Sequence, residues 1–390
     1  MRVLILTSQL HAGAAELLGV DLAVNLNRRG VHAMVACMYS EGMQGAACAK
    51  SEILRRGVPT VHFLDLPVRP TPRQLLRGIA KLRAILTRER VDILETSSPA
   101  LGILGSLACA GSRVMHVAGL HQTFYRDEHK SIRERLFAFC TQWRKRTAFY
   151  AVSESVKSTW LAYSGTRESR TRVVYNSICI SDTTPDRRDM RKKLRGELGT
   201  SDSAHIALCV ARLAAYKRQD FLLEALWPLC AGGNLAIVFV GDRDLTVPGT
   251  KRMLDRMDAT IRKHDLALHV RFLGYRADIH ELMAGADVLV HPTGKEAFGL
   301  VLAEAMAMGL PIVATRLEAI PEVVCEPDNI LVPPDDPEAF RTAVVDMLAR
   351  TPAHAEQVRA RNQARGRMYR PDVRTQKMLA FYQDLLKAHP

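Results

Sequence analysis

Several features that would indicate a metal centre or a membrane-spanning protein are missing from this chain of 390 residues. Its eight cysteines form no Cys-x-x-Cys pair, and the closest two, Cys37 and Cys48, are eleven positions apart. No apolar run approaches the roughly 20 residues that a membrane-spanning helix needs. The first residues, MRVLILTS, lack the basic flank, apolar core and cleavage pattern of a signal peptide. We therefore expect a cytoplasmic protein with reduced thiols and with neither a zinc site nor a redox motif.

Positive charge is concentrated in the first half of the chain. The whole sequence has a net charge of +13, and residues 1–180 carry 25 Lys and Arg against 13 Asp and Glu. Residues 126–146, RDEHKSIRERLFAFCTQWRKR, interleave these cations with apolar side chains. Such a segment can lie on an anionic membrane or contact an acidic partner, but a core-facing helix with a solvated basic side looks the same. The apolar residues are Ile132, Leu136, Phe137, Phe139, Cys140 and Trp143.

Nucleic acid is not expected as a partner, although so basic a half could contact phosphate backbones. The sequence contains no helix-turn-helix, zinc-finger or aromatic RNP pattern. The composition, with 47% hydrophobic and 24% charged residues, is that of a globular protein.

Strand and helix patterns alternate from one end of the chain to the other. A chain of this length suits two domains, and the alternation predicts parallel sheets with helices on both faces. The polar, Pro-containing stretch 177–188 reads as the connector between two doubly wound α/β halves. The expected strands are residues 3–7, 31–37, 92–95, 114–118, 149–152, 205–211, 236–240, 270–273, 287–291 and 311–314.

The stretch EAFGLVLAEAMAMGLPIVAT, residues 296–315, places two carboxylates, Glu296 and Glu304, eight positions apart. The pattern predicts a helix from about Phe298, closed by Gly309 and followed by an apolar strand. Glu296 then lies in a loop at the carboxyl end of a parallel strand, where doubly wound sheets bind ligands and a helix N-terminus offers N–H groups to an anion. The ordinary alternatives are a first-turn charge for Glu296 and a solvated helix residue for Glu304.

A second segment, VARLAAYKRQD at residues 210–220, places Arg212 and Lys217 between an apolar strand and the next helix. The planar fork of Arg and the point charge of Lys are the two usual ways of neutralising phosphate oxygens. Each residue alone is equally compatible with an ordinary surface charge. Two cations and two carboxylates in separate loops nevertheless predict one shared site.

These segments resemble a known family. The Glu296/Glu304 stretch is similar to the E-x7-E motif of retaining glycosyltransferases of the GT-B fold, in particular glycosyltransferase family 4, and residues 210–220 resemble that family's phosphate-binding segment. Further strings follow in the family's order along most of the chain, so the combined pattern is specific although each string alone is weak. They are Gly13-Ala14-Ala15-Glu16, Tyr150 to Glu154, Phe272-Leu273-Gly274-Tyr275 and Ile320-Pro321-Glu322.

The resemblance implies a GT-B architecture of two Rossmann-like, parallel-sheet domains facing a cleft. Residues 1–180 would form the basic acceptor-binding domain, and residues 189–370 would form the nucleotide-sugar donor domain. The last helix, residues 371–390, would pack back on the first domain. Several positions depart from the family pattern, among them Ala14, which replaces a second glycine, and Glu318-Ala319, which stands where Gly-Gly is common.

The resemblance also assigns roles to individual residues. Arg212 and Lys217 would neutralise the diphosphate leaving group, while Glu296 would hold hydroxyls of the donor sugar and Glu304 those of the ribose. His121 would line the acceptor side near the donor sugar, or serve as a hydrogen-bonded structural residue. The backbone of five further residues would complete the donor site: Gly13, Ala14, Phe298, Gly299 and Leu300.

The expected activity is transfer of a hexose-type sugar, with retention of configuration, from a UDP-, GDP- or ADP-sugar. The acceptor would be a lipid-linked glycan or polysaccharide in the synthesis of lipopolysaccharide, exopolysaccharide or capsule. Neither a metal nor another cofactor is required. The alternatives are a small soluble acceptor and a non-catalytic nucleotide-sugar-binding protein. The expected location is the cytoplasm, with peripheral association to the inner face of an anionic cell membrane, through the basic N-terminal domain, as an option.

Overall fold

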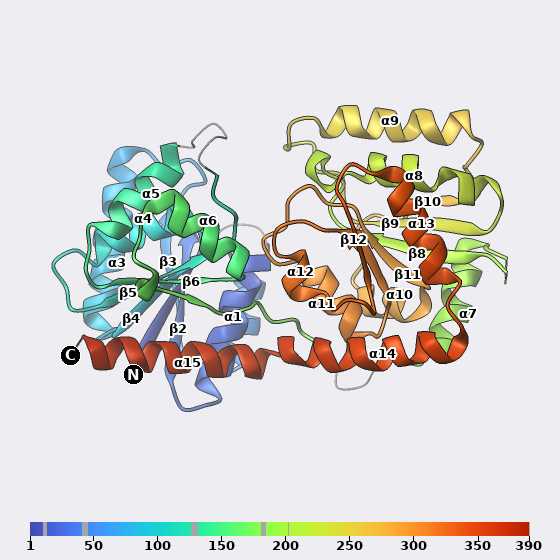
Figure 1. Cartoon of the computed structure of the whole chain (residues 1–390). Coiled ribbons are helices and arrows are strands. Elements are labelled where there is room, and N and C mark those ends of the chain that lie inside the picture. The colour runs from blue at the N-terminus through green and yellow to red at the C-terminus, as the bar shows by residue number, and fades with distance from the viewer. Residues whose placement is uncertain (11–13, 41–45, 126–131, 181–184, 202, 390) are drawn as a thin grey trace. The chain divides into compact units, whose positions relative to one another are not determined.

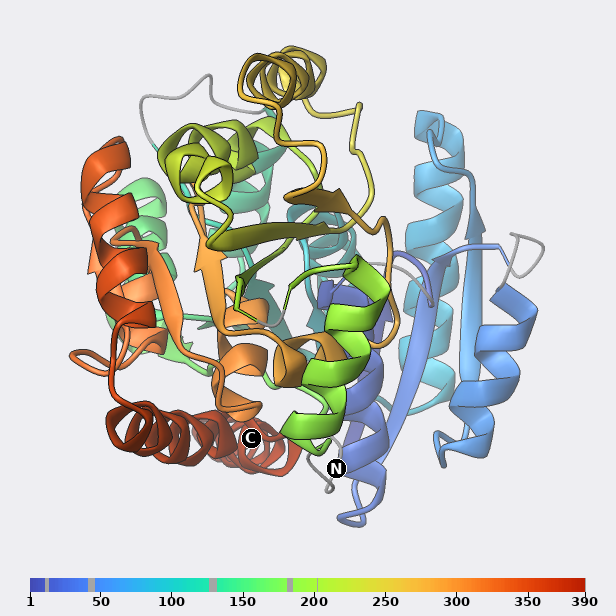
Figure 2. The same ribbon diagram turned by 90° about the vertical axis from the view of Figure 1, so that its right-hand side faces the viewer.

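The computed structural model describes residues 1–10, 14–40, 46–125, 132–180, 185–201 and 203–389 (Figure 1). The chain forms two compact units: the first comprises Met1–Ser177 with Pro371–Pro390, and the second comprises Ile178–Arg370. Each unit is built on a parallel sheet flanked by helices (Figures 1 and 2). Among the described residues, no helix is both long enough and apolar enough to cross a membrane.

The first unit contains a seven-stranded sheet in the order β3-β2-β1-β4-β5-β6-β7. The strand order reverses between β1 and β4, which makes this the topological switch point of the unit. The strands are β1 (Arg2–Thr7), β2 (His32–Tyr39), β3 (Val61–Leu66), β4 (Ile93–Thr96), β5 (Met115–Leu120), β6 (Thr147–Ala151) and β7 (Thr171–Val173). The helices are α1 (Ala14–Asn27), α2 (Ala46–Arg55), α3 (Pro72–Arg88), α4 (Pro99–Ala108), α5 (Ile132–Gln142), α6 (Glu154–Ser164), η1 (Glu168–Arg170) and α15 (Pro371–Ala388).

The second unit contains a six-stranded sheet in the order β10-β9-β8-β11-β12-β13, with its switch point between β8 and β11. Helices α9, α8 and α13 are neighbours in one layer, and α7, α10, α11 and α14 are neighbours in another (Figure 1). The strands are β8 (His205–Val210), β9 (Leu235–Val240), β10 (Val270–Phe272), β11 (Val288–His291), β12 (Ile312–Thr315) and β13 (Ile330–Val332). The helices are α7 (Arg187–Leu198), η2 (Ala215–Lys217), α8 (Gln219–Ala231), α9 (Thr250–Lys263), α10 (Ile279–Gly285), α11 (Leu300–Ala307), α12 (Ile320–Val323), α13 (Pro337–Leu348), α14 (Pro352–Gly366) and η3 (Arg367–Tyr369).

All ten strands expected from the sequence are present, each within two residues of its predicted ends. Their side chains are buried almost throughout, because helices cover both faces of a parallel sheet and leave no polar side. The sequence did not predict strand β3 or the three-residue strands β7 and β13. The helix expected from Phe298 begins two residues later, because Gly299 adopts a left-handed N-cap conformation with φ +86°, and Met308 rather than Gly309 is its C-cap.

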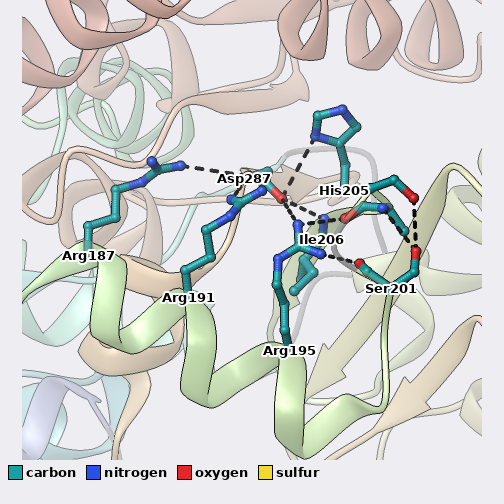
Figure 3. Close-up of polar contacts among 9 residues, drawn as sticks. Arg187, Arg191, Arg195, Ser201, His205, Ile206 and Asp287 are labelled. Carbon is teal, nitrogen blue, oxygen red and sulfur yellow. Dashed lines mark hydrogen bonds and ion pairs between the residues drawn. The ribbon is translucent and has the colours of Figure 1, made fainter.

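A cluster of arginines ties α7 to the sheet of the second unit (Figure 3). Asp287, directly before β11, pairs with Arg191 and lies 3.6 Å from Arg187 and 3.7 Å from Arg195. Its other oxygen accepts the backbone N–H of Ile206 at 2.9 Å. The Asp287 carboxylate thus joins α7 to the amino ends of β8 and β11. The carboxyl ends of these strands lie at the opposite edge of the sheet.

Helix α15 belongs to the first unit although it ends the chain. It packs on α1, where Arg374 donates to the carbonyl of Leu18 at 2.8 Å. Tyr382 is fully buried and donates its hydroxyl proton to Glu95 in β4. These contacts fix the helix to the core of the unit.

Candidate active site

The candidate site is formed by three loops of the second unit that follow the adjacent strands β8, β11 and β12. Lys217 lies after β8 and Glu296 lies after β11, so the two flank the switch point. In doubly wound sheets the loops at the carboxyl ends of these strands diverge, which opens a crevice for ligands. The position agrees with the one that the sequence predicted for both residues.

Lys217, Glu296 and His291 form one hydrogen-bonded cluster. Lys217 Nζ lies 2.7 Å from Glu296 Oε2, and His291 Nε2 lies 3.1 Å from the same oxygen. The Lys217 and Glu296 side chains are only 15% and 14% exposed, and His291 is buried. Among the described residues only one carboxylate oxygen is engaged, which leaves Oε1 available to a ligand.

The electrostatics of this cluster favour the ionised form of Glu296. Burial alone would raise the pKa of this carboxyl, but the hydrogen bonds and charges of His291 and Lys217 outweigh burial and lower the pKa to about 2. Burial also lowers the pKa of His291, so its neutral ring donates the Nε2 proton to the carboxylate. Glu296 is therefore a permanent acceptor of hydrogen bonds near neutral pH.

Backbone hydrogen bonds hold the three loops together. The N–H of Gly294 donates to the carbonyl of Tyr216 at 2.7 Å and so joins the β11 loop to the β8 loop. The N–H of Glu296 donates to the carboxylate of Glu318, in the β12 loop. Glu318 adopts a left-handed φ of +47°, the conformation that explains why glycine is common here in the family. Its side chain replaces that glycine with a direct anchor for the backbone of Glu296.

Arg212 lies in the same β8 loop but does not contact the Lys217–Glu296 pair. Its guanidinium pairs with Asp244, after β9, and donates to the Tyr216 hydroxyl at 3.0 Å. The Arg212 side chain is 62% exposed. On the other side of Tyr216, Lys217 Nζ lies 5.4 Å from the centre of the tyrosine ring. Tyr216 thus stands between the two cations, and the predicted four-residue cluster is not in direct contact.

Glu304 is also separate from that pair. It lies in α11 and is partly buried, and its carboxyl has no hydrogen bond or ion pair to any other residue in the part of the chain that the structure describes. Burial raises the pKa of its carboxyl to about 7. Phe298, Gly299 and Leu300 lead into this helix, whose first backbone hydrogen bond runs from Leu302 N to Gly299 O at 3.0 Å. The backbone N–H groups at the start of α11 point out of the helix N-terminus, where a bound anion is favoured.

The remaining predicted residues belong to the first unit. His121 directly follows β5, is partly buried and lies 3.0 Å from the Tyr150 hydroxyl through its Nε2. Ala14 is the first residue of α1, while Gly13 lies outside the described residues. Both units therefore place predicted residues at carboxyl-end loops of their own sheets.

Sequence reasoning missed His291, Tyr216, Asp244 and the anchoring role of Glu318. His291 ends an apolar strand directly before the proline loop, and a polar residue in that position is the one signal that could have identified it. In the part of the chain that the structure describes, no three His, Cys, Asp or Glu side chains are grouped so that they could hold a metal ion.

Comparison with known proteins identifies the family. Residues 16–182 match the model described as Glycosyltransferase Family 4, and residues 204–350 match the one described as Glycosyl transferases group 1. Over 158 residues the chain is 31% identical to N-acetyl-alpha-D-glucosaminyl L-malate synthase of Bacillus anthracis, which covers 40% of this chain and 39% of that protein.

A second relative is the GDP-mannose-dependent monoacylated alpha-(1-6)-phosphatidylinositol monomannoside mannosyltransferase of Corynebacterium glutamicum, with 27% identity over 185 residues. The match covers 44% of this chain and 45% of that protein, so the chain aligns with less than half the length of either relative. The solved structure of HepE from Anabaena in complex with UDP superposes with a TM-score of 0.81. It covers 98% of this chain and 100% of that chain at 23% identity, which shows the fold.

One family model falls almost entirely on the first unit, and the other falls within the second. The two parallel sheets, their strand orders and the superposition agree with the GT-B architecture. The chain belongs to glycosyltransferase family 4, and it is a glycosyltransferase with the GT-B fold.

Proposed function

We propose that this enzyme transfers a hexose-type sugar, with retention of configuration, from a nucleotide diphosphate-sugar to a lipid-linked or polysaccharide acceptor of a cell-surface glycan. The observation that carries the proposal is the partly buried Lys217–Glu296 pair at the switch point of the second unit. It supplies a cation for phosphate and an ionised carboxylate for sugar hydroxyls side by side. The UDP complex of HepE supports a nucleotide donor.

Each charged side chain has a distinct role in this proposal. The Lys217 ammonium has three N–H donors, so it can keep its bond to Glu296 and still donate to a diphosphate oxygen. Glu296 Oε1 accepts from hydroxyls of the donor sugar. The exposed Arg212 guanidinium contacts the phosphates from the side of Tyr216. Cations beside the diphosphate stabilise the transition state most strongly, because negative charge develops on this leaving group. Lys217 and Arg212 can therefore supply this stabilisation without a metal.

Glu304 fits a ribose. A carboxylate in α11 with no partner among the described residues needs two hydroxyl donors to become favourable in its ionised form. The 2′ and 3′ hydroxyls of a ribose present two such donors. The helix N-terminus at Gly299 and Leu300 adds N–H groups for the diphosphate.

Sugar transfer from radiolabelled UDP-, GDP- and ADP-sugars tests these roles. We expect Glu296→Ala and Lys217→Ala to lower the rate at saturating donor by about 10²-fold or more, the scale for losing one transition-state contact. Lys251→Ala is the matched control, because Lys251 is an exposed lysine of the same unit in α9. An active wild type whose two site variants keep the full rate would refute the assigned roles. NMR of the product reports whether the anomeric configuration is retained.

The acceptor class rests on a surface of the first unit, the α5 surface, made of Ile132, Leu136, Phe139 and Trp143. Ile132, Leu136 and Phe139 are spaced by four and three positions, so they share one face of α5, and Trp143 directly follows the helix. They are 82%, 46%, 67% and 79% exposed, whereas Phe137 on the opposite face is buried. Helix α5 therefore faces the core through Phe137 and has a second apolar face that points outward.

Charge favours an anionic membrane as the occupant of the α5 surface. Arg133, Arg135 and Lys145 flank it, are exposed, and have no ion-pair partner among the described residues. A groove of about 370 Å³ between α4 and α5 extends the apolar area to Leu107. An apolar stripe between cations matches the boundary between acyl chains and anionic headgroups. The Corynebacterium relative, whose name specifies a phosphatidylinositol mannoside, also supports a lipid acceptor.

Liposome flotation tests this part of the proposal. We expect the protein to float with vesicles containing anionic lipid, less with neutral vesicles, and less still at high salt because salt screens the cations. Replacing Phe139 and Trp143 by serine should abolish flotation. Leu268→Ser, which removes an exposed leucine of the second unit, is the matched control and should have no effect. No flotation of the wild type would favour a small soluble acceptor.

A non-catalytic nucleotide-sugar-binding protein is the third candidate. The intact set of Arg212, Lys217, Glu296 and Glu304 argues against it, since binding alone does not need charges aimed at a leaving group. Calorimetric binding of a nucleotide sugar without turnover on any acceptor would favour this alternative.

A further inference from the structure

The first unit holds a chain of buried hydrogen bonds that the roles assigned above do not use. Its members come from the adjacent strands β4, β5 and β6 and from α15. The Tyr150 hydroxyl donates to Glu95 Oε1 at 3.0 Å and also lies 3.0 Å from His121 Nε2. The Tyr382 hydroxyl donates to the other oxygen of Glu95. One buried carboxylate is therefore linked to His121 through a single tyrosine.

Counting the protons in this series of hydrogen bonds assigns the tautomer of His121. Burial and the nearby Arg374 guanidinium lower the pKa of His121 to about 3, so the ring is neutral near pH 7 and carries one proton. A tyrosine hydroxyl has one proton, and Tyr150 gives it to Glu95. With Glu95 ionised, the form that the Arg374 guanidinium and the two donating hydroxyls favour, the Tyr150 oxygen accepts from His121, which places the ring proton on Nε2 and leaves Nδ1 as an acceptor.

The surroundings of Tyr150 support this direction. Burial raises the pKa of Tyr150 well above its usual value, so the hydroxyl keeps its proton. Burial also raises the pKa of Glu95, while Arg374 and the two hydroxyls favour its ionised form. Gly119 lies opposite Tyr150 in the β5–β6 ladder, and a Cβ there would lie 2.5 Å from the Tyr150 hydroxyl oxygen. The space that the hydroxyl occupies exists because Gly119 has no side chain.

We propose that Glu95 and Tyr150 are positioning residues that hold His121 in the Nε2–H tautomer, so that Nδ1 accepts a hydrogen bond from a sugar hydroxyl. Nδ1 has no hydrogen bond to any other residue that the structure describes, and the His121 side chain is only partly buried. The sugar contact rests on the proposed function, whereas the tautomer follows from the first unit alone. A histidine in the other tautomer would present a donor to the same hydroxyl and lose the contact.

NMR of the protein labelled with ¹⁵N-histidine tests the tautomer directly, with the His121→Asn spectrum identifying the signals of this residue. In the unliganded wild type we expect a protonated Nε2 and an unprotonated Nδ1. In Tyr150→Phe, Nε2–H loses its acceptor, so we expect a mixture of tautomers. The kcat for sugar transfer should fall about tenfold, the effect of one lost hydrogen bond, with a smaller change in the donor KM.

Tyr382→Phe is the matched control, because it removes the other hydroxyl from the same carboxylate and leaves the Tyr150–His121 contact in place. We expect it to keep both the tautomer and kcat. A wild-type spectrum with the proton on Nδ1 would overturn the proposal, as would equal losses of kcat in both tyrosine variants, which would indicate a purely structural role. A wild type with no transfer activity would overturn the proposed function, while the spectrum would still decide the tautomer.

Discussion

Each unit buries a carboxylate near the carboxyl edge of its sheet, and the two differ in the groups that hold them. Glu95 in the first unit accepts two neutral tyrosine hydroxyls, and burial raises its pKa. Glu296 in the second unit accepts from the Lys217 ammonium and from His291, and its pKa is lowered to about 2 despite burial. A hydrogen-bonded ammonium thus makes Glu296 a fixed anion, whereas Glu95, with Arg374 nearby and two hydroxyls as direct donors, anchors other side chains.

Glu304 completes the comparison, since it is a partly buried carboxyl with no partner among the described residues. Burial raises its pKa to about 7. Of the three carboxyls, it is the one whose charge state a ligand can most readily change.

The largest effect is expected when the anchor is removed. Glu95→Ala leaves the hydroxyls of Tyr150 and Tyr382 buried without an acceptor, and each unsatisfied group costs about 1–3 kcal/mol. We expect the free energy of unfolding, measured with urea, to fall by about 3–5 kcal/mol in total. Tyr382→Phe removes one donor and should cost less. A Glu95→Ala variant as stable as the wild type would contradict the hydrogen-bonded anchor.

A pH effect of about tenfold is expected at Glu304, the size of one pKa unit of linkage. In the proposed complex, ribose hydroxyls stabilise the ionised carboxyl, so we expect its pKa to be lower there than the value of about 7 in the free protein. Below that value the free carboxyl is protonated and binding must release the proton, so affinity falls as the pH drops from 8 to 6. Calorimetry with a nucleotide sugar measures this, because its pyrophosphate does not titrate in that range. The Glu304→Gln variant should bind with a flat pH profile, and a wild type with the same flat profile would show that Glu304 does not sense the ligand.

The smallest effect is expected at Arg212. Its side chain is 62% exposed and pairs with Asp244, so removing it costs little stability. We expect Arg212→Ala to reduce transfer less than Lys217→Ala does, and to raise the donor KM more than it lowers kcat. Steady-state kinetics of the two variants side by side would decide this. A larger loss of transfer activity in Arg212→Ala than in Lys217→Ala would contradict the proposed roles of the two cations.

The sequence predicted those parts of the fold and site that depend on local pattern. Apolar strands and the loops after them placed Lys217 and Glu296 at the edge of one sheet, because the carboxyl ends of parallel strands share that edge. The partner His291 was missed because a histidine at the end of an apolar strand gives no sign of the carboxylate five residues later. The left-handed Glu318 was noticed only as a departure from glycine, since its contact depends on a backbone angle.

The sequence pattern could not predict contacts between residues that are far apart in the chain. Glu95 and Tyr382 are 287 positions apart, and nothing in the spacing of the sequence links them. The segment 126–146 showed mixed apolar and basic character, but periodicity alone could not tell an inward face from an outward one. The structure separates the two, because Phe137 is buried while Phe139 and Trp143 are exposed.

A crystal structure of the protein with the nucleoside diphosphate that most raises its melting temperature tests the central claim most directly. We predict that Lys217 Nζ lies within hydrogen-bonding distance of a phosphate oxygen while Glu304 accepts from the ribose hydroxyls. We also predict that Glu296 stays bound to Lys217 and His291. A diphosphate bound elsewhere in the second unit, with the Lys217–Glu296 pair untouched, would contradict the account.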